Sequence, residues 1–373
     1  MPFCVLFTEM ELQRTQILLK KLLKWFIPLL FILVIEVLKF FPATIEKYYS
    51  TGCYVYISRL LRVITGYIPF SVGDIFYCIV LCSVVYGIIK LIVKIIRKEA
   101  QWKYVALRFL KFIRKLLWVY IWFNLIWGLN YYREGITAQL HLKVEDYSTE
   151  DLCNLTNLLI IKTNESRLAI SKDSVLPEQP LRSIYREAAA NYNFTETGFA
   201  FLQYKNKSVK KSLYTFLAPY FGFTGYYNPF SGEAQLRDDV PRILIPYTTS
   251  HEMAHQLGYA SETEANFVGY LTATNSNNNY FKYSVYLDLY RYARMELFIR
   301  NTLPDNSNKL DSLVKIDLRN INRFFYKERN NIAGRVTSLY GLYLQANNQQ
   351  KGIDSYDDVI SLLMAYYKQC GKI

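Results

Sequence analysis

Three long apolar runs near the N-terminus constrain the fold of this 373-residue chain more than any other feature. They extend over Leu22 to Phe41, Ile75 to Ile96 and Phe112 to Tyr131. A helix of about 20 apolar residues crosses a bilayer, because it satisfies its own backbone hydrogen bonds in lipid. We therefore predict three N-terminal transmembrane helices in a membrane anchor, residues 1–131, followed by one outer domain, residues 132–373.

Lysine and arginine are concentrated beside these runs. Residues 1–131 carry 17 Lys and Arg against 6 Asp and Glu, whereas residues 132–373 carry 27 against 25. Basic clusters precede the first run and separate the second from the third, while the loop from Pro42 to Tyr67 is poor in them. The positive-inside rule then predicts a multi-pass inner-membrane protein with a cytoplasmic N-terminus and an extracytoplasmic C-terminal domain. Because the outer domain keeps no basic stripe, the net charge of +13 does not indicate nucleic-acid binding.

The motif that indicates chemistry is His-Glu-Met-Ala-His at positions 251 to 255. On a helix, positions i and i+4 lie on one face, so His251 and His255 can bind one metal ion. Glu252 follows the first histidine and is placed to act as general base towards a water molecule. The pattern predicts a Zn²⁺ site on a helix from about Thr249 to Leu257.

A catalytic zinc site needs a third protein ligand, and no further histidine lies nearby. Gly258 is expected to end the metal-binding helix, and Ser261 to cap the next one. Two carboxylates are then available. Glu264 has an alternative role as the partner of Ser261 in a capping box, whereas Glu262 has Asn266 on the same helical face as a polar partner. This favours Glu262 as the ligand and leaves Glu264 as the alternative.

The order His-Glu-x-x-His followed by Glu-x-x-Ala-Asn resembles the gluzincin type of zinc metallopeptidase. The resemblance implies that His251, His255 and Glu262 are metal ligands, that Glu252 is the general base, and that Asn266 orients a ligand. The spacer between the second histidine and the third ligand is shorter than in many gluzincins. Glu264 therefore stays the alternative third ligand.

Nearly the whole chain also resembles a bacterial family of three-span membrane proteins of unknown function. The matching stretches, besides the metal motif, are Pro69 to Asp74, Trp127 to Arg133, Asn228 to Ala234 and Tyr343 to Asn347. This resemblance implies the three-span topology and a peptidase-like site, and it supplies no substrate.

The outer domain is predicted to be mainly α (α+β), a zincin-like, mostly helical fold with a small sheet. Strand patterns occur at Glu233 to Leu236 and at Arg242 to Pro246, and the aromatic segment from Tyr220 to Ser231 is expected to be an ordered loop close to the site. Glu233 to Leu236 is the candidate edge strand for an extended peptide, the alternative being a hairpin that covers the metal helix. Helices are predicted near residues 148–164, 181–192, 280–301, 310–330, 334–345 and 356–369.

Amide hydrolysis also needs a donor for the developing oxyanion. The remaining histidine, His141, has no evident partner and is interpreted as a surface residue. Tyr340, Tyr343 and Arg335 are the candidates, because they lie in or near the C-terminal stretch of the wider resemblance.

These patterns favour a membrane-anchored zinc-dependent peptidase that hydrolyses a peptide or amide bond of a peptide or protein substrate in the cell envelope. The alternative is a non-catalytic envelope scaffold or sensor with a structural or vestigial metal site, although such a site needs no base like Glu252. An intramembrane protease is disfavoured by the polar residues around the motif. The substrate, the oligomeric state and a disulfide between Cys153 and Cys370 stay open.

Overall fold

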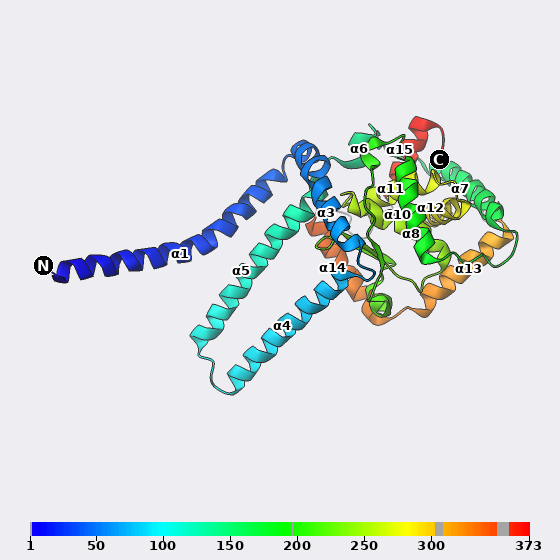
Figure 1. The fold of residues 1–373 in the computed structure, drawn as a ribbon. Helices are drawn as coiled ribbons and strands as arrows, with labels where there is room; N and C mark the ends of the chain where they lie inside the picture. Colours follow the sequence, from blue (N-terminus) through cyan, green and yellow to red (C-terminus); the bar gives the residue numbers. More distant parts are fainter. Residues whose placement is uncertain (1, 196, 303–308, 349–357) are drawn as a thin grey trace.

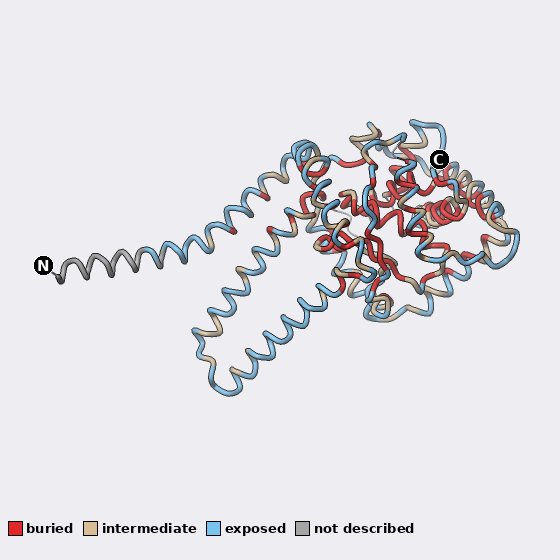
Figure 2. The backbone as a smooth tube through the Cα atoms, in the orientation of Figure 1, coloured by how far each residue is buried: buried red, intermediate tan, exposed pale blue. Residues whose placement is uncertain are grey.

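The structure, a computed structural model, describes residues 2–195, 197–302, 309–348 and 358–373. Helices make up 73% of the fold, and a small three-stranded sheet is present. Figure 1 shows long helices that project to one side of a body built from shorter helices and the sheet. The buried residues gather in this body, whereas the projecting helices are mostly exposed (Figure 2). The predicted mainly helical fold with a small sheet is confirmed.

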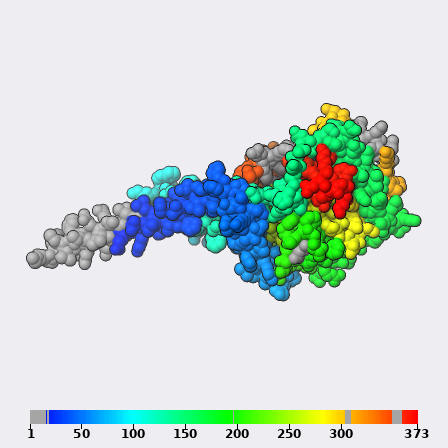
Figure 3. All heavy atoms as spheres, turned by 90° about the horizontal axis from the view of Figure 1, so that it is seen from above, coloured from blue at the N-terminus to red at the C-terminus, as the bar shows by residue number. Residues whose placement is uncertain are grey.

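The projecting helices are α1 (Pro2–Leu38), α4 (Val72–Ile96) and α5 (Trp102–Ile126). Among the described residues, α4 is the one helix that is by itself long and apolar enough to cross a membrane. The segment Leu19–Leu38 passes the same test only together with Pro42–Gly66, from which it is bent by 103°. Helix α5 ends at Ile126, and the chain continues as the short helix η2 (Gly128–Tyr132). The third predicted span, which ends at Tyr131, therefore extends beyond the end of α5. Seen from above, the coloured part of α1 leads away from the body (Figure 3).

The segment between α1 and α4 comprises α2 (Pro42–Thr44), η1 (Ile45–Cys53) and α3 (Tyr54–Gly66). The connection between the first two apolar runs is therefore helical, and it docks on the body. Tyr54, Ser58, Arg62 and Thr65 lie about one turn apart on α3 and are buried. The hydroxyl of Ser58 donates to the backbone carbonyl of Gln256. These polar groups therefore face the body rather than water, and the predicted boundary after residue 131 runs between segments that pack together.

The sheet consists of β1 (Val209–Lys211), β2 (Gly225–Asn228) and β3 (Glu233–Leu236). Its order is β1-β3-β2, with β3 parallel to β1 and antiparallel to β2. In the register, Val209 lies opposite Ala234, and Gly225 lies opposite Leu236. Because both edges of β3 are paired, the prediction that it is an edge strand is wrong. The edge next to it is β2, which lies inside the segment predicted as a loop.

The remaining elements are α6 (Gly135–Gln139), α7 (Thr149–Ile170), α8 (Leu181–Thr195), η3 (Ala200–Leu202), η4 (Thr215–Leu217), α9 (Ala218–Phe221), η5 (Arg242–Leu244), α10 (Ile245–Gln256), α11 (Glu262–Thr274), α12 (Asn279–Ile299), α13 (Ser312–Lys327), α14 (Asn331–Ala346) and α15 (Val359–Cys370). The second predicted strand is wrong, since η5 and the start of α10 occupy it. Pro246 lies in the first turn of α10, where a residue without an N–H is tolerated. The helix is buried almost throughout and packs against α8, α11, α12 and the sheet.

Several local predictions can be compared directly with the structure. Ser148 and Asp151 form a capping box at the start of α7. His141 is exposed, as predicted. Cys153 and Cys370 are free thiols, so the open question of a disulfide between them is answered in the negative for this structure.

Candidate metal centre

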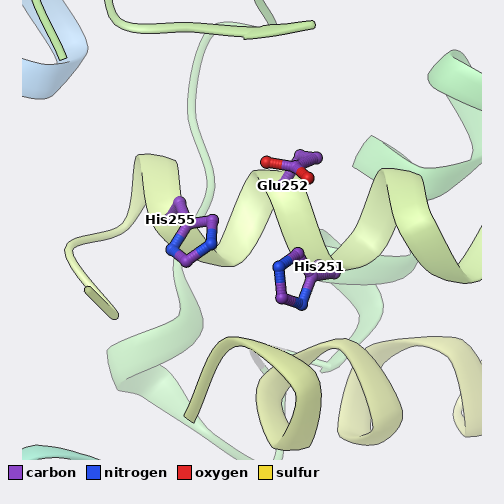
Figure 4. Close-up of side chains that lie close together, drawn as sticks. All are labelled: His251, Glu252 and His255. Carbon is purple, nitrogen blue, oxygen red and sulfur yellow. The ribbon is translucent and has the colours of Figure 1, made fainter. Parts of the chain in front are cut away.

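Helix α10 carries the three residues of the motif on buried positions. The imidazole rings of His251 and His255 are 4.7 Å apart and nearly perpendicular, at 88°. Figure 4 shows both rings on one side of the helix and Glu252 on the other. One potential ligand atom from each of the three residues lies within 4.8 Å of the others. The local helical period therefore produces the arrangement that the motif predicts.

Glu262 brings a carboxylate from α11 to the two histidines. Its Oε2 atom lies 3.2 Å from Nε2 of His251 and 3.7 Å from Nε2 of His255. Gly258 ends α10 with a φ of +90°, a conformation that favours glycine, and turns the chain towards α11. Gly269 lets the two helices approach, because a Cβ there would lie 3.2 Å from the backbone nitrogen of His251. Two imidazole nitrogens and one carboxylate oxygen thus converge.

Glu264 points to a different part of the molecule. Its Oε1 atom accepts a hydrogen bond of 2.7 Å from the backbone N–H of Ile136. The predicted capping box is absent, since the side chain of Ser261 makes no capping hydrogen bond. Glu262 was favoured because Glu264 was expected to cap its own helix. That reason is wrong, since Glu264 is hydrogen-bonded to α6 instead.

The orientation of His255 is defined by the turn that follows α10. Its Nδ1 atom lies 2.7 Å from the carbonyl oxygen of Tyr259, so Nδ1 is the donor and Nε2 is available to a metal ion. Within the described residues, Nδ1 of His251 is buried without a partner. The same holds for Nδ2 of Asn266, which lies one turn after Glu262, so this atom does not perform the predicted orienting role.

The charges in the site are strongly coupled. Burial raises the pKa of Glu252 to about 7. Burial acts to lower the pKa of His255, but its hydrogen bond to Glu262 and the nearby carboxylates raise that pKa to about 9. Burial would raise the pKa of Glu262, yet hydrogen bonds from both histidines hold it well below its usual range. An ionised carboxylate between two imidazoles is a donor set that suits a divalent cation such as Zn²⁺.

Helix α14 brings two of the three candidate oxyanion donors to the site. The hydroxyl of Tyr340 donates to Oε1 of Glu262 at 2.8 Å. The ring of Tyr343 stacks on that of Tyr340, with 6.0 Å between centroids. Arg335 lies on the exposed surface of the same helix, and the described residues show no contact between it and the site. The structure therefore groups the two tyrosines with the ligands and leaves the arginine apart.

An aromatic cluster surrounds His255, and its residue Tyr227 comes from the segment Tyr220 to Ser231 that was predicted to lie close to the site. The ring of Trp127, just beyond α5, lies 6.0 Å from the imidazole, and that of Tyr227 on β2 lies 6.4 Å from it. The hydroxyl of Tyr54 on α3 is 3.2 Å from that of Tyr227. Trp127 belongs to a stretch that marked the wider resemblance, but nothing in the local pattern indicated that it contacts a ligand.

A buried ion pair holds the turn between the ligands. Arg133 makes hydrogen bonds of 2.7 and 2.6 Å with Glu46, and a third of 3.1 Å with the carbonyl of Gly258. Its guanidinium also lies over the ring of Tyr259, 4.7 Å from the centroid. Since the carbonyl of Tyr259 orients His255, this pair supports the position of a candidate ligand.

The fold and the site together describe a helical body that places a buried His-Glu-His cluster beside long apolar helices. The chain belongs to the family described as "Protein of unknown function (DUF3810)", whose family model matches residues 49–364. No curated protein and no solved structure matches the chain. The match includes α3, α4 and α5 as well as the candidate metal centre.

Proposed function

We propose that the protein is a membrane-anchored zinc-dependent peptidase of the cell envelope. The observation that carries this proposal is the convergence of the two Nε2 atoms of His251 and His255 on Oε2 of Glu262, with Glu252 buried beside them. Within the described residues, Oε2 of Glu252 has no hydrogen-bond partner. A buried carboxylate oxygen without a partner destabilises the fold, so its presence favours a chemical role over a structural one.

The ligand set leaves a position for water, as in hydrolytic zinc sites. When bound, Zn²⁺ would lower the pKa of a water molecule and polarise the substrate carbonyl. Glu252 accepts a proton from the attacking water and passes it to the leaving amine. Burial raises the pKa of this carboxyl, which favours its taking up a proton.

The edge strand β2 is the proposed binding surface for the peptide. A Cβ atom on Gly225 would lie 2.7 Å from Oε1 of Glu252, so the β2 backbone passes directly against the proposed base. An extended peptide that pairs with this edge would bring its scissile bond to the metal centre. Tyr340, which contacts Glu262, is the candidate for stabilising the oxyanion.

We further propose the three-span topology with the metal domain on the extracytoplasmic side. The length and apolar composition of α4 support one span. Helices α1, α4 and α5 project to the same side of the body, as the helices of one anchor would (Figure 1). Lys39, just after α1, bonds to Glu36 at 2.9 Å and to Tyr120 of α5 at 2.8 Å, which joins these two helices near their outer ends.

The decisive experiment compares the purified full chain with its Glu252→Gln variant, measuring zinc content and cleavage of a fluorogenic peptide library. We expect both proteins to hold about one zinc ion, and only the wild type to cleave, because an amide cannot accept the proton. Glu134→Gln, a change at an exposed position, is the matched control and should keep both properties. Zinc binding without cleavage by the wild type, together with an unchanged cellular phenotype of Glu252→Gln, would support the non-catalytic scaffold or sensor instead.

A further inference from the structure

The surface formed by η4, α9 and α14 carries exposed apolar side chains. Phe216 is 70% exposed, Leu339 is 66% exposed and Leu342 is 61% exposed. The exposed apolar residues of this surface, which we call the apolar collar, are Leu213, Phe216, Tyr220, Phe221, Ile332, Leu339 and Leu342. No charged residue lies between Lys211 and Glu233, and α14 contains one, Arg335. Such a surface is typical of an interaction site.

The first half of the collar is fixed to the first turn of α4. The backbone N–H of Leu213 donates to Oδ2 of Asp74 at 2.7 Å, and the hydroxyl of Tyr214 donates to the carbonyl of Asp74 at 2.6 Å. Helix α4 has 25 residues. At 1.5 Å per residue its length is about 37 Å, which exceeds the hydrocarbon thickness of about 30 Å. Its first turn therefore stands at the boundary of the bilayer, and this half of the collar lies at the same level.

The second half of the collar lies on α14, which connects α9 with the end of α5. Nδ2 of Asn330 donates to the carbonyl of Pro219 at 2.7 Å, joining the start of α14 to α9. Near the other end, the hydroxyl of Tyr343 is 3.3 Å from that of Tyr131 in η2. Figure 1 shows α14 lying across the ends of α4 and α5. The helix therefore runs along the boundary rather than into the membrane.

The two faces of α14 have different surroundings, since one is exposed and the other contacts the candidate metal centre. Ile332, Arg335, Leu339 and Leu342 follow one another at intervals of three or four residues and form one exposed stripe. Tyr340 is offset from this stripe and contacts Glu262. Apolar side chains with a single arginine are the composition that inserts into acyl chains while the guanidinium reaches a lipid phosphate.

We propose that the apolar collar docks into the headgroup region of the bilayer that α4 crosses, and so holds the metal centre at the membrane surface. The inference rests on the membrane anchorage in the proposed function and does not depend on peptidase activity. It also assigns Arg335 a role as a contact to lipid phosphate, in place of the predicted oxyanion donor.

The test uses nitroxide spin labels on the full chain in vesicles of phosphatidylethanolamine and phosphatidylglycerol. The six native cysteines are replaced by serine, and single cysteines are introduced as Phe216→Cys and Leu339→Cys. Ile88→Cys in α4 is the reference for lipid, and Val175→Cys, at an exposed position remote in sequence, is the reference for water. We expect the two collar labels to be more accessible to oxygen and at least fivefold less accessible to a water-soluble nickel chelate than the Val175 label.

Each other outcome has a distinct meaning. Collar labels as accessible to the chelate as the Val175 label, with the Ile88 label in lipid, would overturn the docking while leaving the anchorage intact. An Ile88 label exposed to the chelate would overturn the anchorage itself. Collar labels shielded from both reagents and broadened by spin–spin coupling would show a second copy of the chain on this surface, which also overturns the proposal.

A second measurement avoids substitution altogether. The wild-type chain is reconstituted with a lipid that carries a photoactivatable headgroup, and the crosslinked peptides are identified by mass spectrometry. Adducts are expected in residues 213–221 and 332–342 and not in residues 172–180. Adducts confined to α4 and α5 would contradict the docking even if the cysteine variants failed to fold.

Discussion

The hydroxyl of Tyr340 donates a 2.8 Å hydrogen bond to Oε1 of Glu262, although the two residues are 78 positions apart in the chain. The other oxygen of the same carboxylate faces the two histidines. Both oxygens of Glu262 are therefore engaged, one by the ligand set and one by α14. This relationship connects the proposed metal centre to the helix that carries half of the apolar collar.

Replacing Tyr340 by Phe should weaken metal binding. The variant keeps the ring that stacks on Tyr343 but loses the hydrogen bond that orients Glu262. Loss of a group that orients a ligand typically costs about 10–100-fold in metal affinity. Competition titration with a zinc chelator measures the change, and Tyr326→Phe, on an exposed residue of α13, is the control. Equal zinc affinity in wild type and Tyr340→Phe would show that the bond does not support the ligand.

Removal of a ligand should have a larger effect than removal of an orienting group. His251→Ala, His255→Ala and Glu262→Gln are each expected to lower zinc affinity by more than about 100-fold, beyond the range of an orienting residue. Glu264→Gln should retain zinc, because its carboxylate is bonded to the N–H of Ile136. Zinc content of the purified proteins decides this. Loss of zinc in Glu264→Gln but not in Glu262→Gln would transfer the third ligand to Glu264.

Gly225→Ala tests the contact between β2 and the proposed base. The new Cβ would lie 2.7 Å from Oε1 of Glu252, so this side chain must move while the ligands stay in place. A displacement of about 1 Å at a reacting group can cost about 100-fold in rate, and we expect a loss of that order at unchanged zinc content. Gly334→Ala is the control, because a Cβ there meets nothing within 4 Å. Full activity of Gly225→Ala on the peptide library would refute the proposed position of the substrate strand.

The ion pair between Glu46 and Arg133 should make stability depend on pH. Burial raises the pKa of Glu46, but the hydrogen bonds and charge of Arg133 outweigh it and bring the pKa below its usual value of 4.5. The lowered pKa stabilises the fold fully above pH 4.5, and this contribution is lost as the pH falls through the folded-state pKa. Glu46→Gln should therefore cost about 3 kcal/mol near neutral pH.

Thermal unfolding of wild type and Glu46→Gln between pH 3.5 and 8 measures this contribution. The difference in Tm should be constant above about pH 4.5 and shrink below it. Glu134→Gln, near Arg133 in sequence but exposed, should show no such trend. A difference that grows on acidification would contradict the sign of the shift.

Features with a local cause could be predicted well. The i, i+4 period places His251 and His255 on one face of a helix whatever surrounds it. Gly258 ends this helix with a positive φ, and Ser148 caps α7 with Asp151, because both effects involve neighbours in the chain. The apolar run from Ile75 to Ile96 lies within α4 for the same reason. Each of these features depends on residues that are neighbours within one helix or one turn of the chain.

Features with a distant cause could not be predicted. The polar residues of α3 were interpreted as part of a loop, since nothing local shows that Ser58 will find the carbonyl of Gln256. Glu264 was expected to cap its own helix, but its carboxylate accepts a hydrogen bond from the N–H of Ile136 instead. Strand β3 was expected at an edge, because a short strand pattern contains no information about what pairs on either side.

The sequence by itself determined the helical character, the apolar segments and the identity of the motif residues, because periodicity and side-chain chemistry act over a few residues. The tertiary structure alone decided which carboxylate meets the histidines, which strand faces Glu252 and which tyrosine reaches Glu262. These choices depend on how whole helices and strands pack, and packing is settled by contacts between segments that lie tens to hundreds of residues apart.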